Sequence, residues 1–369
     1  MTKLKIGLIF GGKSGEHEVS LISARSIYGA LDKNKYDVKL IGIDKKGNWH
    51  LGQNKKIWIG KYGVGKLKLN IKLPVITAIN EKNKIYLVSV KNGKKLADIN
   101  VFFPIAHGTF GEDGCLQGFL ELLGAAYVGP GVLGSAVGMD KDIMKRLFQY
   151  SGLNTAEFVV VKKQDKFNAD KIFKKLGRPV FVKPANLGSS VGVSKARNNK
   201  ELSKAIRNAF QYDNKIIIEE EIKGREIECS VLGNNPPAGG LITSIPGEIK
   251  LKKGHYYSYN AKYIDENTAI PVPKADLTQK EIKIIQEAAV KVFETLCCEG
   301  MGRVDFFLTP KGKLYANEIN TLPGFTSISM YPKMFEQSGI PYPKLLDKLI
   351  TLAIERKKRN EKLKRSFAT

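Results

Sequence analysis

The chain has 369 residues with a formal net charge of +24, and its 43% of hydrophobic residues predict two or three globular domains. The sequence has no apolar run of membrane-spanning length and no leader segment, and its four cysteines show no C-x-x-C spacing. These features favour a cytoplasmic protein with reduced thiols. Because the 60 Lys and Arg are spread along the whole chain, we expect a polyanionic small-molecule ligand and neither a nucleic-acid nor a membrane partner.

Residues 7–14, GLIFGGKS, match the G-x-x-x-x-G-K-[ST] phosphate-loop pattern. Such a loop follows a strand, yet only six residues precede Gly7, and the residues after it are bulky and apolar. The segment is more typical of one buried parallel strand with Gly7 inside it and a turn that begins at Gly11. We therefore expect a nucleotide to bind further along the chain.

Helices and strands alternate in the first third of the chain. The pattern predicts a helix over 19–31, strands over 36–44 and 100–108, and a helix over 115–124. This βαβα order predicts a doubly wound parallel sheet with ligand sites at the strand ends. The lysine- and glycine-rich stretch 45–100 is interpreted as a peripheral insertion with short β-like pieces.

From about residue 140 the pattern changes. It predicts helices over 141–152 and 199–211 and strands around 157–162, 179–183 and 215–222. Residues 246–272 lack a helix or strand pattern, which is typical of a lid or of a disordered segment. A helix over 282–296 and a β-hairpin over 302–324 follow. The basic run 355–365 is typical of the solvated end of a C-terminal helix.

The hairpin carries the strongest chemical signal. Strand alternation places Arg303 and Asp305 on one face, and Glu318 and Asn320 share a face of the return strand. If the turn sets the expected register, these four side chains lie together. Oxygen ligands of this kind suit Mg²⁺, which substrate phosphates then help to coordinate. A solvated hairpin face with a surface ion pair is the alternative.

Two other segments are candidates for nucleotide binding. Lys183 ends a strand just before the small-residue loop 188–192, whose backbone amides can approach phosphates while the lysine adds positive charge. An ordinary glycine-rich hairpin is the alternative. The acidic segment 219–228 is either a solvated strand face or a place where backbone groups meet a base edge and an acid meets ribose hydroxyls.

Seven segments, in this order, resemble the D-alanine–D-alanine ligases of the ATP-grasp superfamily. They are EHEVSLISA (16–24), HGTFGEDGCLQG (107–118), MDK (139–141), FVKPANLGSSVG (181–192), YNAKY (259–263), GRVDFF (302–307) and NEINTLPGFTSIS (317–329). The resemblance runs from residue 4 to about residue 350. Only the stretch 45–100 and the basic tail fall outside it.

The resemblance implies an α/β, three-domain ATP-grasp fold. An N-terminal domain with a doubly wound parallel sheet is expected over 1–128, and two α+β domains that sandwich ATP over 129–220 and 221–369, the last with a lid at about 246–272 and a basic C-terminal helix. It further implies a cytoplasmic enzyme, expected as a homodimer, that joins two D-alanines for peptidoglycan synthesis. ATP converts the first D-alanine to an acyl phosphate, and attack by the second amine leads through a tetrahedral intermediate to dipeptide, ADP and phosphate.

The matching motifs also imply roles for individual residues. Glu18 is expected to bind the ammonium of the first D-alanine and to form a hydrogen-bonded trio with Ser189 and Tyr263, while His107 is either a substrate contact or a structural turn residue. The expected nucleotide-binding residues are Lys141, Lys183, Ser190, Glu219, Glu220, Ile222, Glu226 and Lys262. The expected ligands of two Mg²⁺ (or Mn²⁺) ions are Asp305, Glu318 and Asn320, and the family allows a monovalent cation as well. The oxyanion site is expected at Arg303 and Gly324, and the carboxylate of the second D-alanine at Ser329 and Met330.

An acyl phosphate hydrolyses when solvent water reaches it, so a lid that closes over it is mechanistically required. The stretch 246–272, with Lys262 and Tyr263, fits this role. Under the resemblance, Tyr263 favours an amine as the second substrate. A D-alanine–D-lactate ligase, or another carboxylate–amine ligase of the same fold, is one alternative, and a basic nucleic-acid-binding protein is the alternative from a different class.

Overall fold

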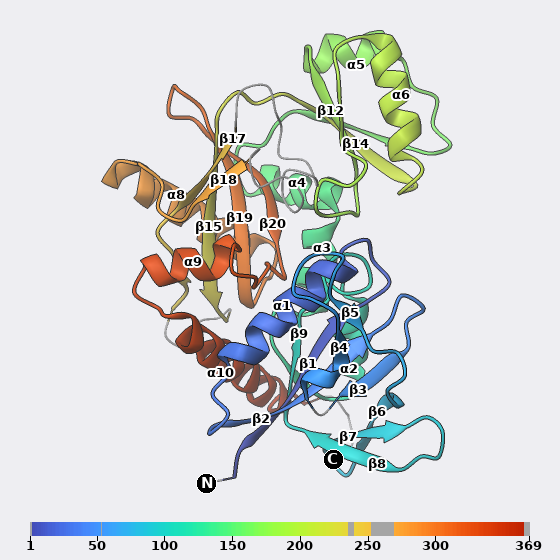
Figure 1. Ribbon diagram of the computed structural model, residues 1–369. Helices are drawn as coiled ribbons and strands as arrows, with labels where there is room; N and C mark the ends of the chain where they lie inside the picture. The colour runs from blue at the N-terminus through green and yellow to red at the C-terminus, as the bar shows by residue number, and fades with distance from the viewer. Residues whose placement is uncertain (1, 53, 235–239, 252–268, 365–369) are drawn as a thin grey trace.

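The computed structural model describes residues 2–52, 54–234, 240–251 and 269–364, and it contains three main sheets that follow one another along the chain (Figure 1). The N-terminal sheet forms the lower part of the molecule in this view, and the central and C-terminal sheets form the upper part. Helices α3 (Val132–Met139) and α4 (Lys141–Tyr150) lie between the two parts. No helix within the described ranges is both long and apolar enough to cross a membrane.

The N-terminal sheet has eight strands in the order β10-β9-β1-β2-β3-β6-β7-β8. They are β1 (Leu4–Gly11), β2 (Tyr36–Ile43), β3 (Trp49–Gly52), β6 (Val75–Glu81), β7 (Lys84–Ser89), β8 (Lys95–Ile99), β9 (Val101–Pro104) and β10 (Ala126–Tyr127). The first four strands of this order run parallel, as predicted, and the others are antiparallel. The helices of this part are α1 (His17–Ala30) and α2 (Cys115–Leu122).

The stretch 45–100 is more than a peripheral insertion. Four of its strands, β3 and β6 to β8, extend the N-terminal sheet beyond β2. A 3₁₀ turn, η1 (Lys55–Ile57), and a small pair of strands, β4 (Trp58–Ile59) and β5 (Lys68–Leu69), pack over α1. The ring of Trp58 stacks on Phe10 with centroids 5.4 Å apart, so the stretch contributes to the core beneath the parallel strands.

The GLIFGGKS segment is a strand followed by a turn, which confirms the interpretation from the sequence. Gly7 lies inside β1, and the turn begins at Gly11 and Gly12, whose φ angles are +89° and +112°. The ammonium of Lys13 lies 5.0 Å from the centre of the Phe110 ring. Lys13 lines neither of the two cavities described below.

The central sheet has four antiparallel strands in the order β11-β14-β12-β13. They are β11 (Phe158–Lys162), β12 (Val180–Pro184), β13 (Ser194–Ala196) and β14 (Lys215–Glu220). Helices α5 (Ala169–Leu176) and α6 (Asn199–Ala209) cover the face that points away from the C-terminal sheet (Figure 1). The opposite face is therefore left for a ligand.

The C-terminal sheet has six antiparallel strands, five of them in the order β18-β17-β15-β19-β20, with β16 paired to β15. They are β15 (Arg225–Gly233), β16 (Ile242–Thr243), β17 (Gly247–Leu251), β18 (Ala269–Val272), β19 (Gly300–Leu308) and β20 (Leu314–Asn320). The helices of this part are α8 (Gln279–Thr295), α9 (Met330–Gln337) and α10 (Tyr342–Glu361). Met144 and Phe148 of α4 belong to the core under this sheet.

The two ends of the stretch 246–272 differ from the expectation. They form β17 and β18, which pair with each other, although no strand pattern was evident in the sequence. Residues 252–268, including the predicted lid residues Lys262 and Tyr263, lie outside the described residues.

The basic C-terminal run is only partly solvated. Arg356 of α10 is 4% exposed and donates hydrogen bonds to the backbone carbonyls of Tyr127, at 2.8 Å, and Gly129. Its guanidinium also lies 4.2 Å from the centre of the Tyr127 ring. Apolar residues of α10 share a core with the N-terminal sheet. Arg356 thus fixes the last helix against that sheet.

Replacing Arg356 with Met should destabilise the fold. The change leaves two buried carbonyl oxygens without their donors, so we expect the free energy of unfolding in urea to fall by about 2–3 kcal/mol. The exposed neighbour Lys358 offers a matched control, because Lys358→Met removes the same charge and should change this free energy by less than about 0.5 kcal/mol. Equal stabilities of the two variants would contradict a structural role for Arg356.

Candidate active site

Two adjoining cavities lie beside the hairpin that the sequence singles out. One, of about 330 Å³, lies between the central and C-terminal sheets, and we call it the inter-sheet cavity. The other, of about 390 Å³, lies where loops of the N-terminal sheet meet the C-terminal sheet, and we call it the junction cavity. The residues that line both are Lys141, Gly188, Ser189, Glu228 and Glu318. Molecules bound in the two cavities would therefore lie next to each other.

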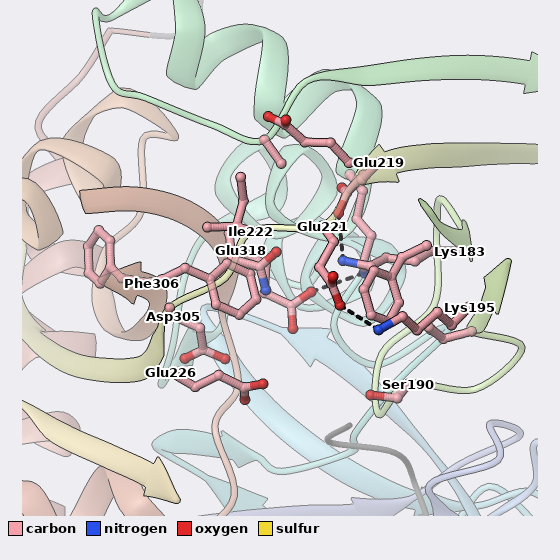
Figure 2. A pocket seen from close by; sticks show the side chains of 18 of the residues that line it. Lys183, Ser190, Lys195, Glu219, Glu221, Ile222, Glu226, Asp305, Phe306 and Glu318 are labelled. Atoms are coloured by element: carbon pink, nitrogen blue, oxygen red, sulfur yellow. Dashed lines mark hydrogen bonds and ion pairs between the residues drawn. The ribbon is translucent and has the colours of Figure 1, made fainter. Parts of the chain in front are cut away.

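Two lysines and one glutamate form a buried charged group beside the inter-sheet cavity, and Figure 2 shows two of its members, Lys183 and Glu219. Lys183 of β12 donates to Glu219 of β14 at 2.6 Å, and Lys145 of α4 lies 3.2 Å from the other oxygen of this carboxylate. Burial alone would raise the pKa of Glu219, but the two lysines outweigh it and lower that pKa to about 2. Two ammonium groups around one carboxylate leave a net positive charge, which suits a phosphate.

The two lysines differ in how burial affects them. Burial lowers the pKa of Lys145, which is shielded from solvent on all sides. For Lys183 burial acts in the same direction, but the carboxylates of Glu219 and Glu318 outweigh it and raise the pKa. Lys145 was not predicted from the sequence. Its spacing of four residues from Lys141, on one face of the same helix, is the signal that could have revealed it.

Lys141 begins α4 at the boundary of the two cavities. Its ammonium donates to the carbonyl of Leu187 at 2.7 Å and lies 3.4 Å from Glu318. Next to it, Ser189 and Ser190 adopt φ angles of +51° and +57°, in the left-handed region that non-glycine residues rarely occupy. Such strained residues concentrate at ligand-binding loops. The loop thus combines a lysine with closely spaced backbone amides.

The inter-sheet cavity also has aromatic and apolar side chains, which suit a flat ring. Phe181, Ile222 and Phe306 line it, and Glu226 lines it as well. The carboxylate of Glu220 accepts a hydrogen bond from the backbone amide of Glu157 at 2.8 Å, so this side chain is already engaged. An ion pair between Lys195 and Glu221, which was not predicted from the sequence, also lines this cavity (Figure 2).

A β-bulge sets the register of the hairpin. Next to the turn Phe306 faces Ala316, but beyond the bulge Asp305 faces Glu318, so Asn317 is the extra residue. Without it, Glu318 would lie opposite Val304, on the buried apolar face. The bulge therefore carries Glu318 and Asn320 to the face of Asp305 and Arg303, which confirms the predicted grouping. The bulge also explains why the polar residue Asn317 interrupts the alternation of apolar and polar residues along β20.

The hairpin side chains interact with one another. The guanidinium of Arg303 donates two hydrogen bonds of 2.8 Å to Asp305 and lies 3.3 Å from Glu228. Within the described ranges, no group of three His, Cys, Asp or Glu side chains could hold a metal ion by itself. Two carboxylates and one amide fit Mg²⁺ or Mn²⁺ only if a bound phosphate supplies further oxygen ligands. The donor set thus fits a metal that arrives with a nucleotide.

Glu16 occupies the junction cavity. It is 8% exposed, directly precedes α1 and accepts a hydrogen bond from Ser189. The backbone of Gly108 packs so close that a Cβ there would lie 2.7 Å from Glu16 Oε2. A buried carboxylate beside a serine can bind an ammonium group.

Glu18 does not occupy the position that the sequence analysis gives it. Its carboxylate pairs with Lys45 at 2.6 Å, and the side chain is not among those that line either cavity. Residues two apart at the start of a helix point to different sides, so Glu16 and Glu18 cannot share one site. The EHEVS motif contains both acids, and only the three-dimensional structure distinguishes them. The structure therefore places Glu16, and not Glu18, at the junction cavity.

His107 lines the junction cavity and is also held by the fold. Its Nδ1 lies 3.3 Å from Glu112 and 3.1 Å from the carbonyl of Leu322, and its Nε2 lies 3.0 Å from Ser23. Burial would lower the pKa of His107, but the Glu112 carboxylate outweighs it and raises the pKa. The fold thus holds His107 at the wall of the junction cavity, and its contact with a substrate stays a prediction.

The remaining predicted residues of the junction cavity lie where β20 leads into α9. The hydroxyl of Ser329 accepts from the amide of Thr326 at 2.9 Å, and Met330 begins the helix. A Cβ on Gly324 would lie 2.7 Å from Ser329 Oγ, so only glycine leaves room here. Gly324, Ser329 and Met330 line the junction cavity together with Glu16.

The two cavities gather the predicted site residues apart from Glu18 and the two lid residues outside the described ranges. The inter-sheet cavity is lined by Lys141, Lys183, Ser189, Ser190, Glu219, Glu220, Ile222, Glu226, Asp305 and Glu318. The junction cavity is lined by His107, Arg303, Asn320, Gly324, Ser329 and Met330, in addition to the shared residues.

Comparison with known proteins agrees with this site. The family models described as D-ala D-ala ligase N-terminus and D-ala D-ala ligase C-terminus match residues 5–130 and 147–351. The D-alanine–D-alanine ligase of Oceanobacillus iheyensis is 49% identical over 366 residues, 99% of each chain. The solved D-alanine–D-alanine ligase from Coxiella burnetii is 37% identical, covers 98% of each chain and superposes with a TM-score of 0.81.

A second solved structure is also similar. The VanG D-Ala:D-Ser ligase from Enterococcus faecalis is 34% identical, with 95% of this chain and 100% of that chain covered and a TM-score of 0.77. The mixed α/β fold, with its partly parallel sheet, is thus the fold of these ATP-dependent ligases. The chain belongs to the D-alanine–D-alanine ligase family, as its sequence motifs predicted.

Changing Glu318 to Gln should weaken metal binding, because it removes one of the two facing carboxylates and keeps the size of the side chain. We expect the affinity for Mn²⁺ in the presence of ADP, measured by electron paramagnetic resonance, to fall by about tenfold or more. Glu287→Gln, at an exposed acid of α8, removes the same charge and serves as the control. Unchanged Mn²⁺ binding by Glu318→Gln would refute the metal assignment.

Proposed function

We propose that this protein joins two D-alanines to D-alanyl-D-alanine, a peptidoglycan precursor, with conversion of ATP to ADP and phosphate. The observation that carries the proposal is the pair of adjoining cavities. One has the charges for a nucleotide, the other has a buried acid for an ammonium group, and Lys141, Ser189 and Glu318 line both. Membership in the family supports the same activity.

We infer a three-domain ATP-grasp arrangement for the chain, with domains over 1–128, 129–220 and 221–369. The three sheets, each with its own helices, support this division. The expected homodimer and cytoplasmic location stay predictions, and sedimentation analysis tests the first of them.

ATP would occupy the inter-sheet cavity. Lys141 and Lys183 would bind its phosphates together with the loop amides near Ser190, because these groups supply the positive charge there. Glu226 would accept hydrogen bonds from the ribose hydroxyls. Adenine would lie where Glu219, Glu220 and Ile222 line the cavity. The last two would bind it through backbone groups, because the Glu220 carboxylate already accepts a hydrogen bond from the amide of Glu157.

Two Mg²⁺ ions would be held by Asp305, Glu318 and Asn320 together with phosphate oxygens. When bound, the metal neutralises the negative charge that builds up on the phosphates during transfer. Lysines and metal ions in place of a Ser-His-Asp set would fit a reaction that depends on positioning and charge neutralisation.

The first D-alanine would bind in the junction cavity with its ammonium at Glu16, which replaces Glu18 in this role. Its carboxylate would then face the γ-phosphate across the boundary marked by Lys141. Transfer forms a carboxyl–phosphate bond and releases ADP. The second D-alanine would bind with its carboxylate at Ser329 and Met330.

The amine of the second D-alanine would then attack the acyl carbon. Arg303 and the Gly324 amide would hold the oxyanion of the tetrahedral intermediate, and donors of this kind are typically worth about 3–4 kcal/mol each. Collapse of the intermediate breaks the carbon–oxygen bond to phosphate and forms the peptide bond. The attacking amine loses a proton in this step, and the departing phosphate takes it up.

Phosphate release with D-alanine and with L-alanine tests the proposed activity. We expect ATP-dependent release with D-alanine and a rate near background with L-alanine.

Chromatography of the products with D-lactate or D-serine added identifies the second substrate, since one solved relative is a D-Ala:D-Ser ligase. A mixed product as the main species would move the assignment to the alternative ligases. Salt-dependent binding of an oligonucleotide without ATP turnover would favour a nucleic-acid-binding protein.

Glu16→Gln and Glu18→Gln separate the two acids of the EHEVS motif. Glu16→Gln removes the buried partner of the ammonium, so kcat/KM for D-alanine should fall by about 100-fold, or ~3 kcal/mol. Glu18→Gln breaks a partly exposed pair with Lys45 and should change kcat/KM by about twofold at most. A larger loss for Glu18→Gln than for Glu16→Gln would restore the original assignment.

A further inference from the structure

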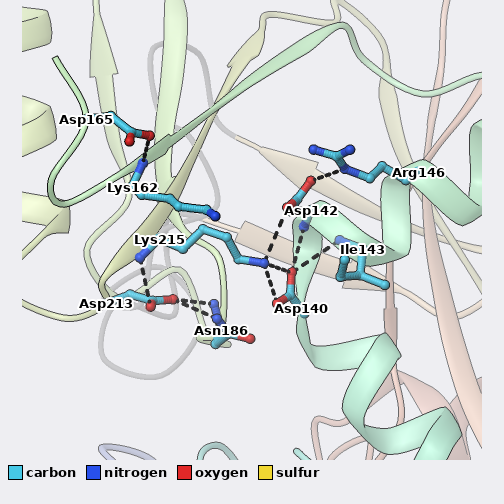
Figure 3. Close-up of polar contacts among 9 residues, drawn as sticks. All are labelled: Asp140, Asp142, Ile143, Arg146, Lys162, Asp165, Asn186, Asp213 and Lys215. Atoms are coloured by element: carbon cyan, nitrogen blue, oxygen red, sulfur yellow. Dashed lines mark hydrogen bonds and ion pairs between the residues drawn. The ribbon is translucent and has the colours of Figure 1, made fainter. Parts of the chain in front are cut away.

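A cluster of ionic contacts outside both cavities joins the central sheet to α4 (Figure 3). The ammonium of Lys215 in β14 lies 2.6 Å and 2.8 Å from the two carboxylate oxygens of Asp140 and 3.3 Å from Asp142. Asp142 also accepts from Arg146 at 2.5 Å. We call these four residues the Lys215 cluster. Neither Lys215 nor the acids line the inter-sheet or the junction cavity.

The cluster connects parts of the molecule that belong to different cores. Lys215 is in the central sheet, whereas α4 packs through Met144 and Phe148 in the core under the C-terminal sheet. Asp140 is the N-cap of α4, and its side chain accepts from the amides of Asp142 and Ile143. Lys215 thus bonds to Asp140, the residue that caps the N-terminus of α4.

The same region carries the groups proposed to bind phosphate. The amide of Lys141 donates to the carbonyl of Ala185 at 3.0 Å, and the amide of Ala185 donates to the carbonyl of Lys215, also at 3.0 Å. Asn186 donates from its backbone and side chain to Asp213, at 2.7 Å and 3.0 Å. Lys215 therefore lies between the start of α4 and the start of the small-residue loop.

We propose that Lys215 is a positioning residue, which holds Lys141 and the small-residue loop at the separation that the phosphates of ATP require. The proposal rests on the proposed binding of ATP in the inter-sheet cavity. Lys215 bonds on one side to Asp140, the neighbour of Lys141, and on the other to Ala185, which lies shortly before the loop. Loss of its charge releases the first connection and leaves the second, which is made by the backbone.

Loss of the Lys215 charge is expected to change the position of Lys141 and not the stability of the fold. Asp140 continues to cap α4 without Lys215, and carboxylates at a helix N-terminus are stabilising in themselves. The side chains of Lys215 and Asp140 are 20% and 19% exposed, so solvent can reach the acids when the lysine is absent. The two acids then repel each other or draw water between α4 and β14, which shifts Lys141 relative to the loop.

Lys215→Met tests the proposal, because Met keeps the apolar stem and removes the charge. We expect the Kd for ATP, measured by calorimetry without D-alanine, to rise about tenfold. KM for ATP should rise in parallel, whereas KM for D-alanine, kcat and the melting temperature should stay close to those of the wild type. Lys215→Arg should restore most of the ATP affinity, since it keeps the charge.

Arg146→Met is the matched control. It removes the other cation that contacts Asp142, but its side chain is 63% exposed and, within the described ranges, hydrogen-bonds to Asp142 and not to Asp140 or the loop. ATP affinity should then change by about twofold at most. Asp140→Asn keeps a capping side chain and loses the charge, so its combination with Lys215→Met should weaken ATP binding no further than Lys215→Met alone.

Three results would overturn the inference. ATP affinity of Lys215→Met equal to that of the wild type would show that the cluster does not position the phosphate-binding groups. A lower melting temperature with an equal rise of KM for ATP and D-alanine would show a role in folding alone. Additive effects of Asp140→Asn and Lys215→Met would show that the two residues act separately. Failure of the wild-type protein itself to bind ATP would instead refute the proposed function.

Discussion

The one-residue bulge at Asn317 is the constraint on which the site depends. The hairpin of β19 and β20 has one apolar face in the core and one polar face at the cavities, and a shift of one residue exchanges the faces of a strand. The bulge places Glu318 opposite Asp305 and leaves Ile319 in the core. Both the metal-binding potential of the site and the packing beneath it follow from this single extra residue.

Charge is distributed unevenly around the hairpin, and this distribution suits the two proposed substrates differently. Lysines from α4 and β12 give the inter-sheet cavity a positive side, which suits phosphates, whereas Glu16 gives the junction cavity a buried negative group. Lys141 and Ser189 lie at the boundary and face both cavities. In the proposed reaction a nucleotide phosphate and an amino-acid carboxylate would meet there, although both are anions, and the ammonium of Lys141 would offset part of their negative charge.

The sequence predicts the local features of this protein well and its long-range placements less well. The parallel strands, the helix at 141–150 and the hairpin follow from periodicity, and the strand inside GLIFGGKS was distinguished from a phosphate loop by its bulky apolar residues. Glu16 and Glu18 are chemically alike, so only their orientation around α1 shows which one reaches the cavity. Lys145 meets Glu219 across 74 positions of the chain, a contact that periodicity does not report. The stretch 45–100 is rich in lysine and glycine, so its sequence did not indicate a part of the main sheet. It extends the sheet because alternate residues of its strands are buried on one face.

The central claim is that the carboxylate of the first D-alanine attacks ATP directly at the boundary of the two cavities. D-alanine labelled with ¹⁸O in its carboxylate tests this claim, because the phosphate leaves with an oxygen that came from the amino acid. The account predicts that each phosphate released during dipeptide synthesis carries one ¹⁸O, as measured by mass spectrometry. Unlabelled phosphate, formed at the same rate as the dipeptide, would contradict it.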